Sequence, residues 1–138
     1  MKVLGATVDV KIASAESGGR YYVFEVTLPP GEGVPPHVHS MEDEVICVIE
    51  GQLEISIDGG SELAGPGTVR NFPIGVSHGF ANTGNEPCRA IVYATPGTNF
   101  EQYFAELSQI SEGPEIDMGE VVAISERFGL NFLLDGEG

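Results

Sequence analysis

Residues 31–51 read GEGVPPHVHSMEDEVICVIEG, and residues 67–82 read GTVRNFPIGVSHGFAN. These two segments contain all three histidines of the chain, His37, His39 and His78, among closely spaced glycines and prolines. Around them, across most of the chain, short β-branched runs alternate with Gly and Pro clusters. Because such turn signals at roughly 8 to 12 residue spacing are typical of sandwiches and barrels, the sequence predicts an all-β fold.

Two of the expected strands differ in their faces. Leu53, Ile55 and Ile57 alternate with polar residues, which is typical of a strand with one solvent-facing side, and the DGG at residues 58–60 then predicts a hairpin turn. Residues 45–49 are instead apolar on both faces. One face of this strand should line an interior, and the other should be covered by a helix or by another subunit.

Helical periodicity begins in the last third of the chain. Thr98 and Glu101 fit a capping box, and an apolar stripe at helical spacing follows, formed by Phe100, Tyr103, Phe104, Leu107 and Ile110. A second helix is expected from Asp117 to Gly129. Both helices are expected to cover the strand layer.

The length of the chain limits its domain organisation. Its 138 residues are enough for one compact domain with its own core, and they leave no room for a second catalytic domain. We expect residues 1–97 to form a β-barrel domain and residues 98–138 to form a helical extension that packs on the barrel.

Composition and charge exclude several classes of protein. With 21 acidic and 6 basic residues, the net charge is −15, which repels phosphate backbones and anionic lipids, so we expect neither nucleic acid nor a membrane as a partner. The N-terminus lacks the apolar run of a signal peptide, which predicts a cytoplasmic location. Cys47 and Cys88 lie in apolar strand-like runs, where cysteine most often behaves as a small buried hydrophobe.

The histidine spacing suggests a metal site. His37 and His39 are two residues apart, so on a strand both imidazoles project from the same face. Glu44 follows a polar loop long enough to return its carboxylate towards this pair, and His78 comes from a separate strand. Three imidazoles with one carboxylate suit Fe, Mn, Ni, Cu, Co or Zn, and suit Ca poorly. A lone histidine in a strand is more often a surface or core residue, but the shared spacing favours a metal site.

The glycines and prolines around these residues complete two motifs. The first motif consists of Gly31, His37, His39, Glu44 and Gly51. The second consists of Gly67, Pro73, Gly75, His78 and Asn82. With both motifs in order, the chain resembles the cupin superfamily over about residues 20 to 96, and it is most similar to single-domain bacterial cupins described as quercetin-dioxygenase-like.

This resemblance implies a double-stranded β-helix, which is a jelly-roll-like β-barrel, with a short C-terminal helical extension and one divalent transition metal. By position, the implied metal ligands are His37, His39, Glu44 and His78. Glu44 is also implied as a general base that leaves the metal and takes a proton from the substrate. Structural roles are expected for Gly51 and Gly75 at positive φ and for Asn82 at a turn.

An apolar interior is expected around the ligands. Its expected lining consists of Ile46, Val48 and Phe80, with Tyr22, Phe24 and Phe72 as further candidates. Core packing is the competing interpretation for each of them. Arg70 is the one basic residue of the second motif, so it either pairs with an acidic group of the substrate or lies exposed on its strand.

Three functions are consistent with this pattern. The first hypothesis is a metal-dependent dioxygenase acting on a small enolisable or cyclic substrate of the flavonol or diol kind. The second is a non-redox isomerase, cyclase or lyase, and the third is a small-molecule-binding cupin without catalysis, because one fold supports all three. A 2-oxoglutarate oxygenase normally uses two histidines and one carboxylate, so four expected ligands argue against that class. A homodimer is expected, since residues 45–49 present an apolar outer face.

Overall fold

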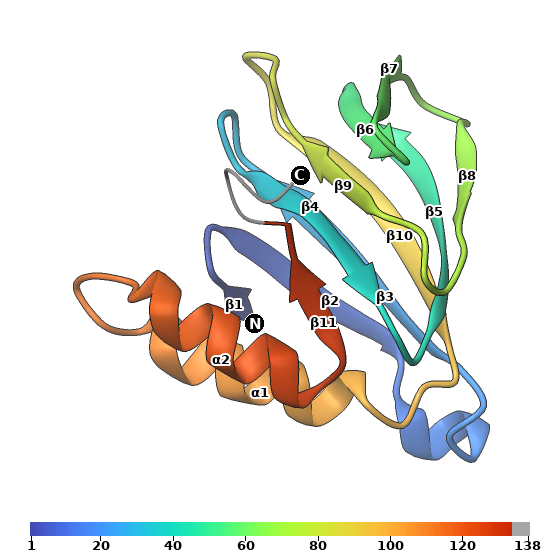
Figure 1. The fold of residues 1–138 in the computed structure, drawn as a ribbon. Helices are drawn as coiled ribbons and strands as arrows, with labels where there is room; N and C mark the ends of the chain where they lie inside the picture. The colour runs from blue at the N-terminus through green and yellow to red at the C-terminus, as the bar shows by residue number, and fades with distance from the viewer. Residues whose placement is uncertain (134–138) are drawn as a thin grey trace.

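The computed structural model describes residues 1–133 as two antiparallel sheets that face each other (Figure 1). The first sheet has the order β1 (Lys2–Val3), β2 (Ala6–Ile12), β3 (Tyr22–Leu28), β10 (Cys88–Thr95), β5 (Asp43–Glu50) and β8 (Val69–Phe72). The second has the order β11 (Leu130–Phe132), β4 (Gly33–His39), β9 (His78–Ala81), β6 (Leu53–Ile57) and β7 (Gly60–Ala64). The predicted all-β, jelly-roll-like barrel is therefore confirmed.

Turns of the expected kind connect these strands. β6 and β7 are joined through Asp58 and Gly59, whose φ angles of 50° and 83° are those of a two-residue hairpin turn. Gly51 and Gly75 also have positive φ, at 78° and 81°, as predicted. Asn82 opens its turn by accepting a hydrogen bond from the Gly84 N–H at 3.0 Å.

The inward faces of β3, β5 and β10 form the core between the sheets. Side chains on these faces are at most 5% exposed, among them Phe24, Val26, Ile46, Val48 and Val92. This buried face holds the sheets together, because burying an apolar side chain of this size contributes about 1.5–3 kcal/mol. A rigid scaffold therefore surrounds the residues that the next subsection describes.

The outward face of β5 lacks the expected helical cover. Val45 and Cys47 are half-buried and Ile49 is exposed, whereas the helices pack elsewhere. α1 (Phe100–Ser111) packs against β1, and α2 (Met118–Arg127) packs against β11, so the pair closes one end of the space between the sheets (Figure 1). The helices therefore pack on strands of the barrel but do not cover the outward face of β5, and the homodimer stays a prediction.

The predicted helices form, but one of the predicted starts is wrong. The stripe of α1 is buried at Phe100, Tyr103, Phe104 and Leu107. The N-cap of α1 is Asn99 rather than Thr98, and no side-chain capping bond forms there. The Asn99 amide instead binds groups outside its own helix, as described below. The second start is confirmed, because Asp117 caps α2 by accepting a bond from the Gly119 N–H.

The C-terminal segment also contributes a strand that the sequence did not predict. β11 follows Gly129 and pairs with β4, so that Leu130 lies opposite His39 and Phe132 lies opposite His37. This pairing places the C-terminal segment beside two of the predicted metal ligands. The segment is thus part of the barrel wall as well as a helical extension.

Two smaller expectations concern the compartment. Among residues 1–133, no helix has the length and apolarity needed to cross a membrane.

Cys88 is buried and Cys47 is half-buried, and both are free thiols. Burial raises the pKa of the Cys88 thiol, which suits a packing role better than a nucleophilic one. The cytoplasmic location stays a prediction.

Candidate metal centre

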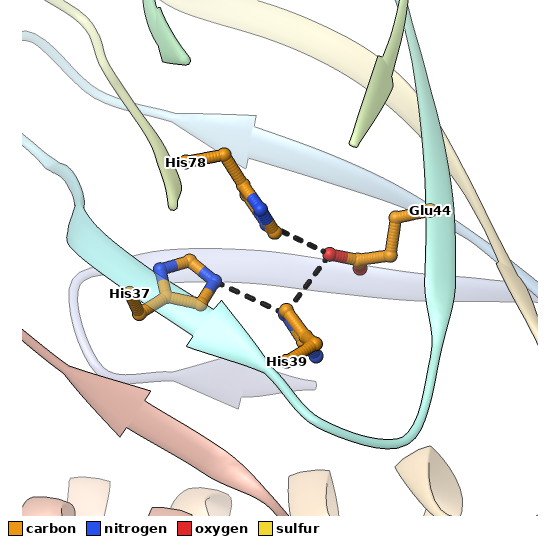
Figure 2. Close-up of side chains that lie close together, drawn as sticks. All are labelled: His37, His39, Glu44 and His78. Carbon is orange, nitrogen blue, oxygen red and sulfur yellow. Dashed lines mark hydrogen bonds and ion pairs between the residues drawn. The ribbon is translucent and has the colours of Figure 1, made fainter. Parts of the chain in front are cut away.

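The four predicted ligands come together between the two sheets (Figure 2). His37 and His39 lie on β4 and His78 opens the neighbouring strand β9, where it is directly opposite His37. Glu44 reaches them from β5 in the facing sheet. The loop of residues 40–42 crosses from one sheet to the other, as the sequence predicts, and returns the carboxylate to the histidines.

The donor atoms converge closely. The Nε2 atoms of His37 and His39 are 3.1 Å apart, and Glu44 Oε1 lies 3.0 Å from His39 Nε2 and 3.1 Å from His78 Nε2 (Figure 2). The four ligand atoms all lie within 4.8 Å of one another. None of the four residues is more than 5% exposed, so this polar cluster is enclosed in the protein interior.

Backbone carbonyls orient two of the three imidazoles. His37 Nδ1 donates to the carbonyl of Pro35 at 2.8 Å, and His78 Nδ1 contacts the carbonyl of Val76 at 3.3 Å. A proton on Nδ1 leaves Nε2 with its lone pair, which is the form in which histidine ligates a metal. The His37 ring therefore aims a free lone pair at the centre of the cluster, and His78 Nε2 faces the Glu44 carboxylate.

A buried carboxylate orients the third imidazole. Glu42 is fully buried, and its Oε1 accepts a hydrogen bond from His39 Nδ1 at 3.0 Å. Its Oε2 accepts from the Asn99 side-chain amide at 3.0 Å, and the same amide donates to the Phe128 carbonyl at 2.5 Å. The orientation of His39 is therefore linked through Glu42 and Asn99 to the ends of both C-terminal helices.

The donor set fits a bound cation. Two imidazole lone pairs only 3.1 Å apart repel each other unless a positive charge lies between them. Burial alone would lower the pKa of His39, but Glu44 and Glu42 outweigh burial and raise it to about 9. In the metal-free protein a proton on His39 supplies this charge at neutral pH. Three nitrogens and one carboxylate oxygen are the donors that divalent transition metals prefer, so these residues could hold such an ion.

His37 and Glu44 are already in the form that binds metal. Burial, followed by the neighbouring His78 and His39, lowers the pKa of His37 to about 3, so its imidazole is neutral at physiological pH. Burial would raise the pKa of Glu44, but the attraction of His39 and the hydrogen bonds from His39 and His78 outweigh it and lower that pKa. Glu44 is therefore a carboxylate at neutral pH.

Aromatic rings pack around the imidazoles. Phe72 stacks on His78 with ring centroids 4.1 Å apart. Phe100 of α1 lies 5.8 Å from the His39 ring, and Phe132 of β11 lies 5.6 Å from the His37 ring. These contacts restrict the orientation of the rings and keep water away from the cluster.

A cavity of about 100 Å³ opens beside the cluster. Its wall includes His37, His39 and Glu44, and most of the remaining wall is apolar, with rings from Phe24, Phe80, Phe100, Phe104 and Phe132. Tyr103 also lies in this wall, and its hydroxyl is hydrogen-bonded to Ser125 Oγ at 2.7 Å. No lysine or arginine of residues 1–133 lines the cavity, which is therefore better suited to an apolar molecule than to a carboxylate.

Ile46 and Val48 face the barrel interior, as predicted, and pack in its core. Of the predicted inward residues, Phe80 and Phe24 also line the cavity. Tyr22 and Phe72 are core residues as well. Arg70 lies on the surface, where it pairs with Glu62. The interpretation of Arg70 as an exposed strand residue is thus the correct one.

Sequence reasoning missed several residues that shape the site. Glu42 is the first of three consecutive acids after His39, and no sequence pattern separates this buried residue from its exposed neighbour Asp43. Asn99 and Phe132 reach the site only through the packing of the C-terminal segment. For Phe100, the predicted helical stripe was the available signal, although the stripe did not indicate which partner the ring would contact.

Comparison with known proteins agrees with this geometry. Residues 24–93 match the cupin domain family, which is half of the chain. Mannose-1-phosphate guanylyltransferase of Escherichia coli is 27% identical over 86% of this chain, and quercetin 2,3-dioxygenase of Bacillus subtilis is 33% identical over 56% of it. The chain spans 21% of the first of these relatives and 23% of the second, so each is a much longer protein.

A solved structure extends the similarity. The polyketide cyclase RemF from Streptomyces resistomycificus is 30% identical with a TM-score of 0.59, and the match covers 69% of this chain and 70% of that one. The two facing sheets, the clustered histidines and both comparisons agree. The chain belongs to the cupin superfamily.

Proposed function

We propose that this protein is a metal-dependent dioxygenase acting on a small enolisable or cyclic organic substrate. Its ligands would be His37, His39, Glu44 and His78, which hold one divalent transition metal. The observation that carries the proposal is the convergence of three Nε2 atoms and one carboxylate oxygen beside an apolar cavity. Open metal positions facing a cavity are the mark of a catalytic site rather than a structural one.

The donor spacing fits a single ion held by all four side chains. Neighbouring donor atoms are 3.0 to 3.1 Å apart, and the four ligand atoms lie within 4.8 Å of one another. This donor set suits Fe, Mn, Ni, Cu, Co or Zn. When bound, such an ion would polarise a chelating oxygen and, if redox-active, exchange electrons with substrate and dioxygen.

The protein itself would bind the substrate and move its proton. Glu44 is ionised at neutral pH and borders the cavity, so its carboxylate is placed to accept a proton from an enol or phenol. The phenylalanine rings around the cavity would exclude water and hold an apolar body. A cavity of about 100 Å³ encloses at most about one ring, since an apolar cavity of roughly 150 Å³ holds a benzene. One-ring diols and diketones are therefore better candidates than three-ring flavonols.

A second candidate is a non-redox cyclase or isomerase with the same ligands. The observation that favours it is the similarity to RemF, which extends over 69% of this chain, whereas the match to quercetin dioxygenase covers 56%. In that case the metal would only polarise a carbonyl, while Glu44 would still move the proton.

Reconstitution with defined metals separates these functions. Metal-free protein would be loaded with Fe, Mn, Ni, Co, Cu or Zn and given catechols and cyclic 1,3-diketones, with oxygen uptake and product formation recorded together. Oxygen-dependent turnover with a redox metal, lost in Glu44→Gln, supports the dioxygenase. Turnover under nitrogen with Zn favours the cyclase or isomerase. If the protein shows neither activity but binds a ligand tightly and releases it chemically unchanged, it is a binding protein, which would contradict the proposal.

A further inference from the structure

A single carboxylate borders the cavity away from the metal centre. Glu32 lies in its wall and is exposed, whereas His37, His39 and Glu44 are at most 5% exposed. The cavity therefore runs from buried donor atoms to an outer end at which Glu32 meets solvent. Apart from the ligands and Tyr103, Glu32 is the one polar side chain in this wall among residues 1–133.

The local backbone leaves room for this carboxylate. Gly5 lies in the turn between β1 and β2, and a Cβ added there would be only 1.9 Å from Glu32 Oε2. The side chain of Glu32 thus occupies the space that a larger residue at position 5 would fill. Both Gly5 and Glu32 line the cavity, so the absence of a side chain at position 5 leaves space for the carboxylate in the cavity wall.

The carboxylate is free to bind a ligand. The backbone of Glu32 is satisfied, because its N–H donates to the Pro29 carbonyl at 3.1 Å and its carbonyl accepts from the Asn82 N–H at 2.8 Å. Its side-chain oxygens accept no hydrogen bond and pair with no cation within residues 1–133. This differs from Glu25, Glu62 and Glu106, each of which pairs with an arginine.

We infer that Glu32 selects substrates that carry a hydrogen-bond donor, best a protonated amine, at the end remote from the metal. This inference rests on the proposed function, because it takes the other end of the substrate to chelate the ion. Glu32 and His37 are five positions apart in the sequence, which is at most about 16 Å of extended chain. A ring that chelates the ion would direct a short tail towards Glu32, whose carboxylate would attract an ammonium group and repel a carboxylate.

Three catechols test this selection because they differ only in the tail. Dopamine carries an ammonium group, 4-methylcatechol is neutral and 3,4-dihydroxyphenylacetate carries a carboxylate. Their binding to Ni-loaded protein would be measured by titration calorimetry under nitrogen. Dopamine is expected to bind about fivefold more tightly than the neutral catechol, and the acid about fivefold more weakly, as for an exposed charge pair.

Two variants and one control complete the design. Glu32→Gln should bring the three affinities to within about twofold, and Gly5→Ala should reduce the spread by displacing the carboxylate without changing the net charge. Glu54→Gln is the matched control, because Glu54 is exposed on β6 outside the cavity and its replacement changes the net charge by the same amount. It should keep the full spread.

The outcomes separate this inference from the proposed function. If none of the catechols binds the loaded wild-type protein, the open metal position is wrong and the proposed function fails. Equal affinities for all three in the wild type would overturn the role of Glu32 and leave the metal site intact. A spread that persists in Glu32→Gln, or that collapses equally in Glu54→Gln, would assign the selectivity to overall charge and would also overturn the inference.

Discussion

Replacing Glu42 by glutamine should weaken metal binding while leaving the barrel folded. In the native protein, Oε1 of this buried carboxylate accepts from His39 Nδ1 and its Oε2 accepts from the Asn99 amide, both at 3.0 Å. A glutamine has the same shape but only one acceptor oxygen. Its amide group must therefore face another donor, either the imidazole N–H or the amide of Asn99.

The size of the effect follows from the role of this contact. Removing the partner that orients a metal-binding histidine typically reduces metal affinity by about 10- to 100-fold, which is about 1.4–2.7 kcal/mol. Because Glu42 is fully buried and contacts His39 directly, we expect a loss of at least about tenfold. Asn99→Ala should have a smaller effect on affinity, since it leaves the bond between Glu42 and His39 in place.

The affinity for Co is measured by letting the protein compete with a chromophoric chelator for the ion. Thermal unfolding of the metal-free protein, monitored by circular dichroism, shows whether the variant is folded. Glu54→Gln serves as the control for the change in charge. If Glu42→Gln folds normally and binds Co within about twofold of both the wild type and this control, the reasoning about orientation is refuted.

Three further predictions concern the ligands, the fold and the assembly. Metal binding must displace the proton from His39, whose pKa is about 9, whereas His37 is already neutral. The apparent metal affinity should therefore rise about tenfold per pH unit between about pH 6 and 8. An affinity that does not change with pH would contradict this prediction. Gly129→Ala should lower the free energy of unfolding in urea by about 1–2 kcal/mol. The φ angle at Gly129 is 80°, and a Cβ there would lie 2.9 Å from Met41 Cγ. An unchanged urea midpoint would argue against this prediction. Light scattering at micromolar concentration should give a homodimer paired through the outward face of β5, where Val45 and Cys47 are half-buried, and a monomer mass would exclude this.

The predictable parts of this molecule are those in which local sequence determines geometry. The period of two along β4 placed His37 and His39 on one face, and Asp58 and Gly59 adopt the positive φ angles that their turn requires. Neither feature depends on distant residues. The ligand cluster could be predicted from the sequence for this reason. Only Glu44 and His78 depend on the chain folding back towards the His37–His39 pair.

The parts that could not be predicted depend on contacts between distant segments. Glu42 is buried because Asn99, which is 57 residues later, supplies a donor beside it. The same contact explains the incorrect capping box, since the Asn99 amide binds Glu42 and the Phe128 carbonyl rather than its own helix. β11 is only three residues long, too short for a periodicity to be detected, and it becomes a strand because β4 offers an edge.

Metal content measured on untagged protein tests the central claim most directly. Elemental analysis should find about one equivalent of a divalent transition metal per chain, because the cluster offers one set of four converging donors. His37→Ala and His78→Ala should lose most of that metal and remain folded by circular dichroism. Wild-type protein that takes up no transition metal even when it is supplied, or variants that retain a full equivalent, would contradict the assignment of these residues as a metal centre.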